Sequence, residues 1–106
     1  MSWTYLFIAG LFEIGWPLGF KLSQTTAHKL LWIVFSIISM IASGVFLWLA
    51  QKTIPVGTAY AVWTGTGIVG AFVIGMLLFG DPANLLRIVS ATLIVVGLVG
   101  FRISQP

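Results

Sequence analysis

The chain has no cysteine, one histidine and two acidic residues among its 106 residues. Without cysteine there are no disulfides and no thiolate chemistry. One histidine alone disfavours a metal site with nitrogen or sulfur ligands. That histidine, His28, lies in a predicted loop far from Glu13, so no Ser, His and acid triad assembles in one chain. No segment resembles a phosphate-binding loop. We therefore expect neither an enzyme nor a cofactor.

Charge is also scarce, because 7% of the residues are charged and 59% are hydrophobic. An ordinary soluble domain carries about a quarter charged residues. The net charge of +3 comes from five scattered Lys and Arg residues, which is too sparse for a nucleic-acid surface. This composition predicts an integral membrane protein whose surroundings are the lipid bilayer.

Four long apolar segments follow one another along the chain. About 20 apolar residues cross the hydrocarbon as a helix, and each segment has about that length. The predicted spans are residues 3–21, 30–50, 56–79 and 85–103, separated by polar loops at 21–29, 51–55 and 80–84. Short loops favour antiparallel neighbours, so residues 1–106 are predicted to form a single all-α, four-helix transmembrane domain. The first segment lacks a basic leader and a small-residue cleavage site, so we expect it to remain as a span.

Glu13 is the only acidic residue within the predicted spans, and it lies near the middle of the first one. A carboxylate in hydrocarbon costs several kcal/mol unless it is paired, protonated or faces a wet cavity. An ionisable residue at that depth therefore indicates a functional site. The alternative is a protonated, hydrogen-bonded glutamic acid with a purely structural role.

Residues at three- and four-residue spacing share a helix face with Glu13. They are Gly10, Trp16, Pro17 and Phe20. Pro17 cannot donate a hydrogen bond to the carbonyl four residues back, which is that of Glu13. We therefore expect a kink in the first span and a free Glu13 carbonyl.

Two further stripes are candidate walls of a cavity around Glu13. The second span carries Ser36, Ser39 and Ser43, and the third carries Tyr60, Trp63, Gly67 and Ala71. Serines in membrane helices also serve close helix packing, and this alternative applies to Ser36 and Ser39 in particular. For Ser43 both interpretations stay open.

The sequences of residues 55–67 (PVGTAYAVWTGTG) and 9–16 (AGLFEIGW) resemble the small multidrug resistance transporters. Chain length, the four spans and the place of the membrane carboxylate fit the same family. A Trp three residues after the Glu, and Trp-Thr-Gly in the third span, are similar to its guanidinium-exporter subtype. Asp81 stands where related exporters often have Glu, Pro17 replaces a small apolar residue, and the first loop is one residue longer than is common.

The resemblance implies a proton-coupled antiporter in the bacterial inner membrane that exports guanidinium and small substituted guanidinium cations. It also implies an antiparallel homodimer of two four-helix protomers. Glu13 would bind proton and cation alternately. The matching residues around it are Gly10, Trp16, Ser43, Tyr60 and Trp63. Two alternatives stay open: a broader exporter of quaternary ammonium ions, and a non-transporting accessory subunit whose Glu13 pairs with a basic residue of a partner helix.

Charge at the ends of the spans gives little preference for one orientation in the membrane. With four spans, two basic residues lie on one side and three on the other: Lys52 and Arg102 against Lys21, Lys29 and Arg87. The excess of Lys and Arg sets orientation during insertion. So small a difference predicts that copies insert in both directions, as an antiparallel homodimer requires.

Overall fold

The computed structural model describes residues 1–104. These residues form four helices: α1 (Ser2–Thr25), α2 (Lys29–Ala50), α3 (Val56–Phe79) and α4 (Leu85–Ser104). Each helix is long and apolar enough to cross a membrane by length and composition. The predicted all-α membrane fold with four spanning helices is therefore confirmed.

The first loop is shorter than the sequence predicted. Helix α1 continues through its polar end to Thr25, so only residues 26–28 separate it from α2. The Thr25 hydroxyl donates to the Lys21 carbonyl at 3.1 Å, and the Thr26 hydroxyl donates to the Leu22 carbonyl at 2.8 Å. These hydroxyls bond carbonyls one turn back, which lets a polar segment stay helical.

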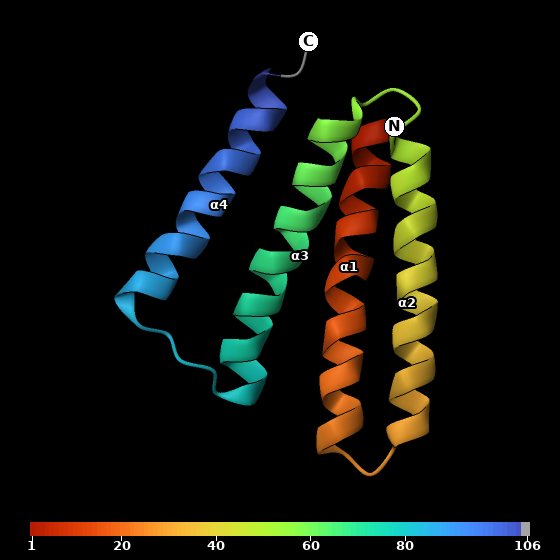
Figure 1. Ribbon diagram of the computed structural model, residues 1–106, viewed down its shortest axis with the longest axis vertical. Coiled ribbons are helices and arrows are strands. Elements are labelled where there is room, and N and C mark those ends of the chain that lie inside the picture. The colour runs from red at the N-terminus through yellow and green to blue at the C-terminus, as the bar shows by residue number, and fades with distance from the viewer. Residues whose placement is uncertain (105–106) are drawn as a thin grey trace.

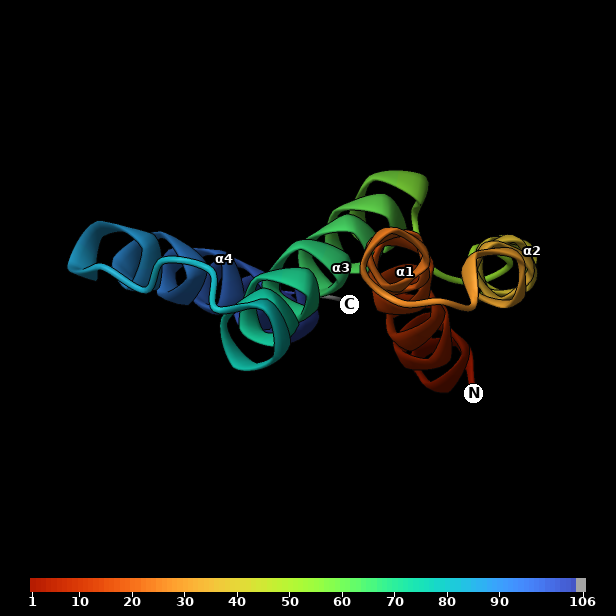
Figure 2. The same ribbon diagram turned by 90° about the horizontal axis from the view of Figure 1, so that it is seen from below.

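The four helices stand in an open row rather than a closed bundle. Helix α1 lies between α2 and α3, and α4 lies beyond α3 (Figures 1 and 2). Within residues 1–104, the backbone of α4 approaches that of α3 alone, and the Arg102 side chain of α4 reaches Trp3 of α1. The molecule extends 16 Å along its shortest axis, against 47 and 34 Å along the other two. The four helices lie side by side in a single layer (Figure 2).

The serines of α2 belong to the α1–α2 contact. The Ser36 hydroxyl donates to the Trp16 carbonyl at 2.9 Å. A Cβ added to Gly15 would lie 3.0 Å from Ser39 Oγ, so the two helices approach closely there. The prediction of a cavity wall is wrong for Ser36 and Ser39, and the packing alternative holds.

Helix α1 is continuous through Pro17. The carbonyl that accepts a side-chain hydrogen bond near this proline is that of Trp16, whose donor is Ser36. No side chain within residues 1–104 donates to the Glu13 carbonyl. The predicted partner for that carbonyl is thus not found in the described part of the protomer.

A small apolar cluster joins the first three helices at the end that carries the α2–α3 loop. It consists of Leu6, Ala50, Ile54 and Ala59, all buried. Trp3, Tyr5, Leu47, Val62 and Trp63 pack around it. This cluster fixes α1, α2 and α3 relative to one another, one to two turns from the site described below.

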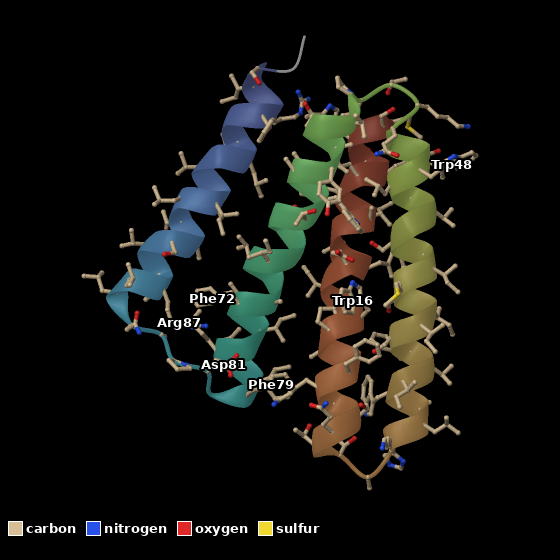
Figure 3. All side chains as sticks on the ribbon, viewed as in Figure 1. Trp16, Trp48, Phe72, Phe79, Asp81 and Arg87 are labelled. Carbon is tan, nitrogen blue, oxygen red and sulfur yellow. The ribbon has the colours of Figure 1, made fainter. Side chains whose placement is uncertain are left out.

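Basic side chains at the helix ends lie over aromatic rings. The Arg102 guanidinium is 4.8 Å from the centre of the Trp3 ring, and the Arg87 guanidinium is 5.3 Å from that of Phe72 (Figure 3). Such positions suit long basic side chains and aromatic rings at the membrane interface. Both cations belong to the two ends of α4.

Candidate functional site

Glu13 lies on α1 one turn before Trp16, and the two side chains are directly bonded. The Trp16 indole Nε1 donates to Glu13 Oε1 at 2.5 Å. Residues three apart share a helix face, which is why the α1 backbone brings them together. Trp16 is the only side chain within residues 1–104 that hydrogen-bonds this carboxylate. The protomer thus supplies one donor and no basic partner to the acid.

Helix α3 packs directly against Glu13 at Gly67. A Cβ added to Gly67 would lie 2.6 Å from Glu13 Cγ, so any larger residue there would displace the Glu13 side chain. A cavity of about 190 Å³ opens beside this contact between α1 and α3. Its lining residues are Glu13, Trp16, Pro17, Thr64, Gly67, Ile68 and Ala71. We call this space the Glu13 cavity.

Thr64 also lines the Glu13 cavity, and the sequence analysis did not single it out. Its Oγ1 is buried and has no hydrogen-bond partner within residues 1–104. A buried hydroxyl left without a partner costs about 1–3 kcal/mol. The signal was present in the sequence, because Thr64 precedes Gly67 by three residues and Ala71 by seven, on one helix face.

A second cluster of predicted site residues lies between α2 and α3. The Trp63 indole Nε1 donates to Ser43 Oγ at 2.7 Å, and the Ser43 hydroxyl donates to the Ala9 carbonyl of α1 at 2.8 Å. The Tyr60 ring lies 5.6 Å from the Trp63 ring, and Tyr60 is 57% exposed. The Ser43 proton is therefore directed at the α1 backbone.

Gly10 lies at the α1–α3 contact. A Cβ added to it would lie 2.7 Å from Thr66 Cγ2, which indicates close approach of the two helices. Of the six predicted site residues, the structure brings Glu13 and Trp16 to the Glu13 cavity. Ser43, Tyr60 and Trp63 form the second cluster, which does not line that cavity within one protomer. Gly67 and Ala71 do line it, as their helical spacing predicted.

Comparison with known proteins identifies the family. The sequence model of the Small Multidrug Resistance protein family matches residues 1–94. The chain belongs to this family. It is 46% identical over 104 residues to the "Guanidinium exporter" of Escherichia coli strain K12, a match that covers 98% of each chain. The "Guanidinium exporter" proteins of Citrobacter freundii and Salmonella typhimurium strain LT2 are 46% and 45% identical over the same length.

Membership in the Small Multidrug Resistance family agrees with the four spanning helices. The chain is a multi-pass protein of the inner membrane. Its relatives are named as exporters, which indicates transport rather than an enzymatic reaction. The resemblance found from the sequence motifs is confirmed over nearly the whole chain.

Proposed function

We propose that this protein exports guanidinium and small substituted guanidinium cations in exchange for protons, with Glu13 binding the two ions alternately. The observation that carries the proposal is the Glu13 carboxylate itself. It lines a cavity between two membrane helices, and its one hydrogen-bond partner in the described protomer is an indole N–H. The names of the relatives, which share nearly half of the sequence, support the choice of cation.

The chemistry of the cavity suits a planar cation. Guanidinium offers forked N–H donors that match a carboxylate. Trp16 holds Oε1 of Glu13 and leaves Oε2 for the cation, while its ring adds an aromatic face worth about 0.5–2 kcal/mol to a positive charge. Thr64 lines the same cavity, and its buried Oγ1, unpartnered within residues 1–104, would accept one further N–H once the Thr64 side chain turned toward the ion. Three different groups thus recognise one small ion.

Competition for a single negative charge produces the coupling. A proton on Glu13 removes the charge that holds the cation, and a bound cation disfavours the proton. When the cavity opens to each side of the membrane in turn, occupation by one ion or the other gives exchange without a nucleotide. No other acidic side chain lines the Glu13 cavity, so the competition centres on this residue.

A second copy of the chain completes the transporter in this proposal. One protomer is a single layer of helices, α4 has no buried residue, and Tyr60 of α3 is exposed. An antiparallel partner would cover these surfaces and bring Tyr60 and Trp63 to a shared cavity. The even distribution of basic residues between the two sides supports insertion in both orientations.

Liposomes that contain the purified protein test the proposal. With an acidic interior, radiolabelled guanidinium should accumulate inside, and a protonophore that collapses the pH gradient should abolish accumulation. Methylguanidinium should compete, whereas tetraethylammonium should compete weakly. Equal transport of tetraethylammonium would favour the broader quaternary-ammonium exporter. Absence of any cation exchange would favour the accessory subunit.

A further inference from the structure

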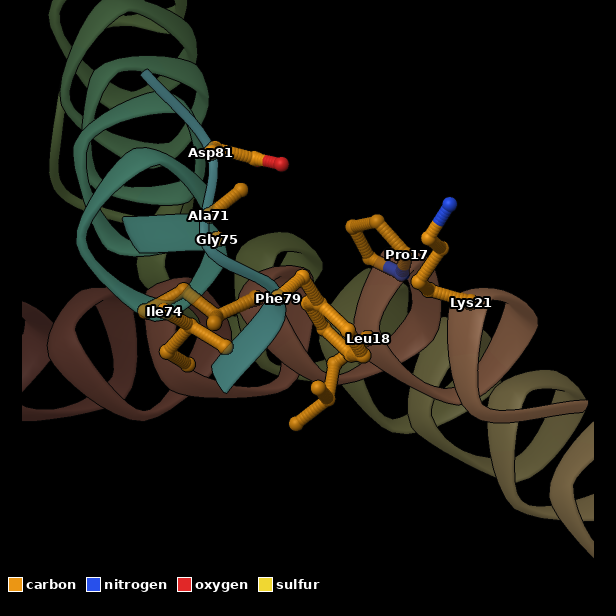
Figure 4. A pocket seen from close by; sticks show the side chains of 9 residues that line it. Pro17, Leu18, Lys21, Ala71, Ile74, Gly75, Phe79 and Asp81 are labelled. Atoms are coloured by element: carbon orange, nitrogen blue, oxygen red, sulfur yellow. The ribbon is translucent and has the colours of Figure 1, made fainter. Parts of the chain in front are cut away.

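A second cavity adjoins the Glu13 cavity. It lies nearer to the end of the helices at which the α1–α2 and α3–α4 loops are found. It has a volume of about 250 Å³ and lies between α1 and the last two turns of α3 (Figure 4). Its lining residues are Ile14, Pro17, Leu18, Lys21, Ala71, Ile74, Gly75, Phe79 and Asp81. Pro17 and Ala71 line both cavities, so the two spaces meet at these residues. We call this second space the outer cavity.

Asp81, the only other acidic residue of the chain, is held in the wall of the outer cavity. Helix α3 ends at Phe79 and is capped by Gly80, whose φ of 66° is the left-handed conformation that glycine adopts without strain. This turn lets the Asp81 backbone N–H bond to the Gly75 carbonyl at 3.1 Å. The Asp81 carboxylate lies where a Gly75 side chain would otherwise be. The carboxylate is therefore folded back onto α3.

Lys21 of α1 faces the same cavity from the opposite wall. Figure 4 shows the Asp81 carboxylate pointing toward the side from which Pro17 and Lys21 project. No hydrogen bond joins the two charged groups within residues 1–104. The Lys21 ammonium stands on a flexible stem of four carbons that reaches over several Å. A movable cation and a fixed anion thus share one cavity next to Glu13.

We infer that Asp81 is an outer binding site for the guanidinium ion, and that the Lys21 ammonium competes with guanidinium for the Asp81 carboxylate. An arriving cation displaces Lys21 from Asp81, and the Phe79 ring in the same wall offers it an aromatic face. The ion then passes Pro17 and Ala71 to reach Glu13. When Lys21 returns to Asp81, the outer cavity no longer holds a second cation. This inference rests on the proposed guanidinium export.

Two substitutions separate the roles of Asp81 and Lys21 in reconstituted exchange. Asp81→Asn should raise the apparent KM for guanidinium by up to about fivefold, the upper end of what accessible charge pairs produce, with a maximal rate within about twofold. Asp81→Glu keeps the charge and should stay within about twofold of the wild-type KM. Lys21→Met should lower the KM, because the competitor is gone. Lys29→Met, the matched loss of charge at the same end but outside the cavity, should leave KM unchanged.

The double variant tests whether Lys21 acts through Asp81. In the Asp81→Asn background, Lys21→Met should have no effect on KM. Near 1 M salt, where charges are screened beyond about 3 Å, the difference between wild type and Asp81→Asn should disappear. An unchanged KM in Asp81→Asn, an equal rise in Asp81→Glu, or a Lys21→Met effect that survives without Asp81 would overturn the inference. Wild-type protein that exchanges no guanidinium would instead overturn the proposed function.

Discussion

The α1–α2 contact and the α4 surface show opposite ways of using a membrane helix. In α2, three serines are buried against α1, where Ser36 and Ser43 donate to α1 carbonyls. In α4, no residue is buried, and the Ser90 and Thr92 hydroxyls bond carbonyls of their own helix at 2.8 Å. Both helices are apolar and long enough to span the membrane. Hydrophobicity alone therefore does not decide which helix packs inside the protomer.

The difference between α2 and α4 follows from the lipid that surrounds membrane helices. Lipid tails are as apolar as leucine, so burying apolar side chains between helices gains little in a bilayer. Small residues that permit close contact, and hydroxyls that bond across helices, supply the attraction instead. Gly15 and Gly19 provide the space on α1 that the serines of α2 fill. A Cβ added to Gly97 or Gly100 of α4 would meet nothing within 4 Å, so these small residues serve no helix contact in the described chain.

The largest effect on stability is expected when a larger side chain replaces a glycine at the α1–α2 contact. A Cβ at Gly19 would clash with Ser36 Oγ and lie 3.0 Å from the Trp32 backbone carbonyl. Gly19→Val should therefore destabilise this pair by about 1–3 kcal/mol, as overpacking does. Backbone hydrogen exchange in α1 and α2 should rise. The matched change Gly97→Val in α4 should leave exchange in α1 and α2 unaltered, and equal responses would contradict the comparison.

A smaller effect is expected at the α1–α3 contact, where glycine serves the site. Gly67→Ala places a methyl group against Glu13 Cγ, and the flexible Glu13 side chain shifts to make room. Because reacting groups displaced by about 1 Å lose much of their efficiency, guanidinium exchange should fall about tenfold while the protomer stays folded. Gly57→Ala, where nothing lies within 4 Å, is the control. Exchange at the wild-type rate in Gly67→Ala would place Glu13 outside the transport site.

The smallest effect is expected from substitutions at Thr64, which compare a hydroxyl without a hydrogen-bond partner in the described chain with the bonded hydroxyl of Ser43. Ser43 already donates to a carbonyl and accepts from an indole, whereas Thr64 Oγ1 has no partner within residues 1–104. Thr64→Val should weaken guanidinium binding about threefold to tenfold, the size of one hydrogen bond, with normal folding. Thr64→Ser should keep the affinity. Equal losses in both variants would show that shape, not the hydroxyl, matters at this position.

The spans and the importance of Glu13 could be predicted because hydrocarbon imposes strict rules. Uncharged segments of about 20 residues have few alternatives to a spanning helix, and one carboxylate among them is conspicuous. Helical spacing puts Gly67 and Ala71 on one face of α3, and close packing was the interpretation their small size favoured; both in fact line the Glu13 cavity, and Gly67 also packs against Glu13. These inferences need only the period of a helix and the chemistry of one side chain.

Helix neighbours could not be predicted in the same way. A stripe such as Ser36, Ser39 and Ser43 looks the same whether it lines a cavity or contacts another helix, and the facing element decides between them. The short loops predicted that consecutive helices are neighbours, and this is wrong for α2 and α3, because α1 lies between them. Residues 26–28 form a shorter loop than predicted because the Thr25 and Thr26 hydroxyls bond helix carbonyls.

Proton release on guanidinium binding tests the central claim most directly. Purified protein in weakly buffered solution is titrated with guanidinium, and the protons released are counted with a pH indicator across a range of pH. If cation and proton compete for Glu13, wild-type protein should release protons as guanidinium binds, and Glu13→Gln should neither bind the ion nor release protons. Wild-type binding without proton release at any pH, or equal release from Glu13→Gln, would contradict the account.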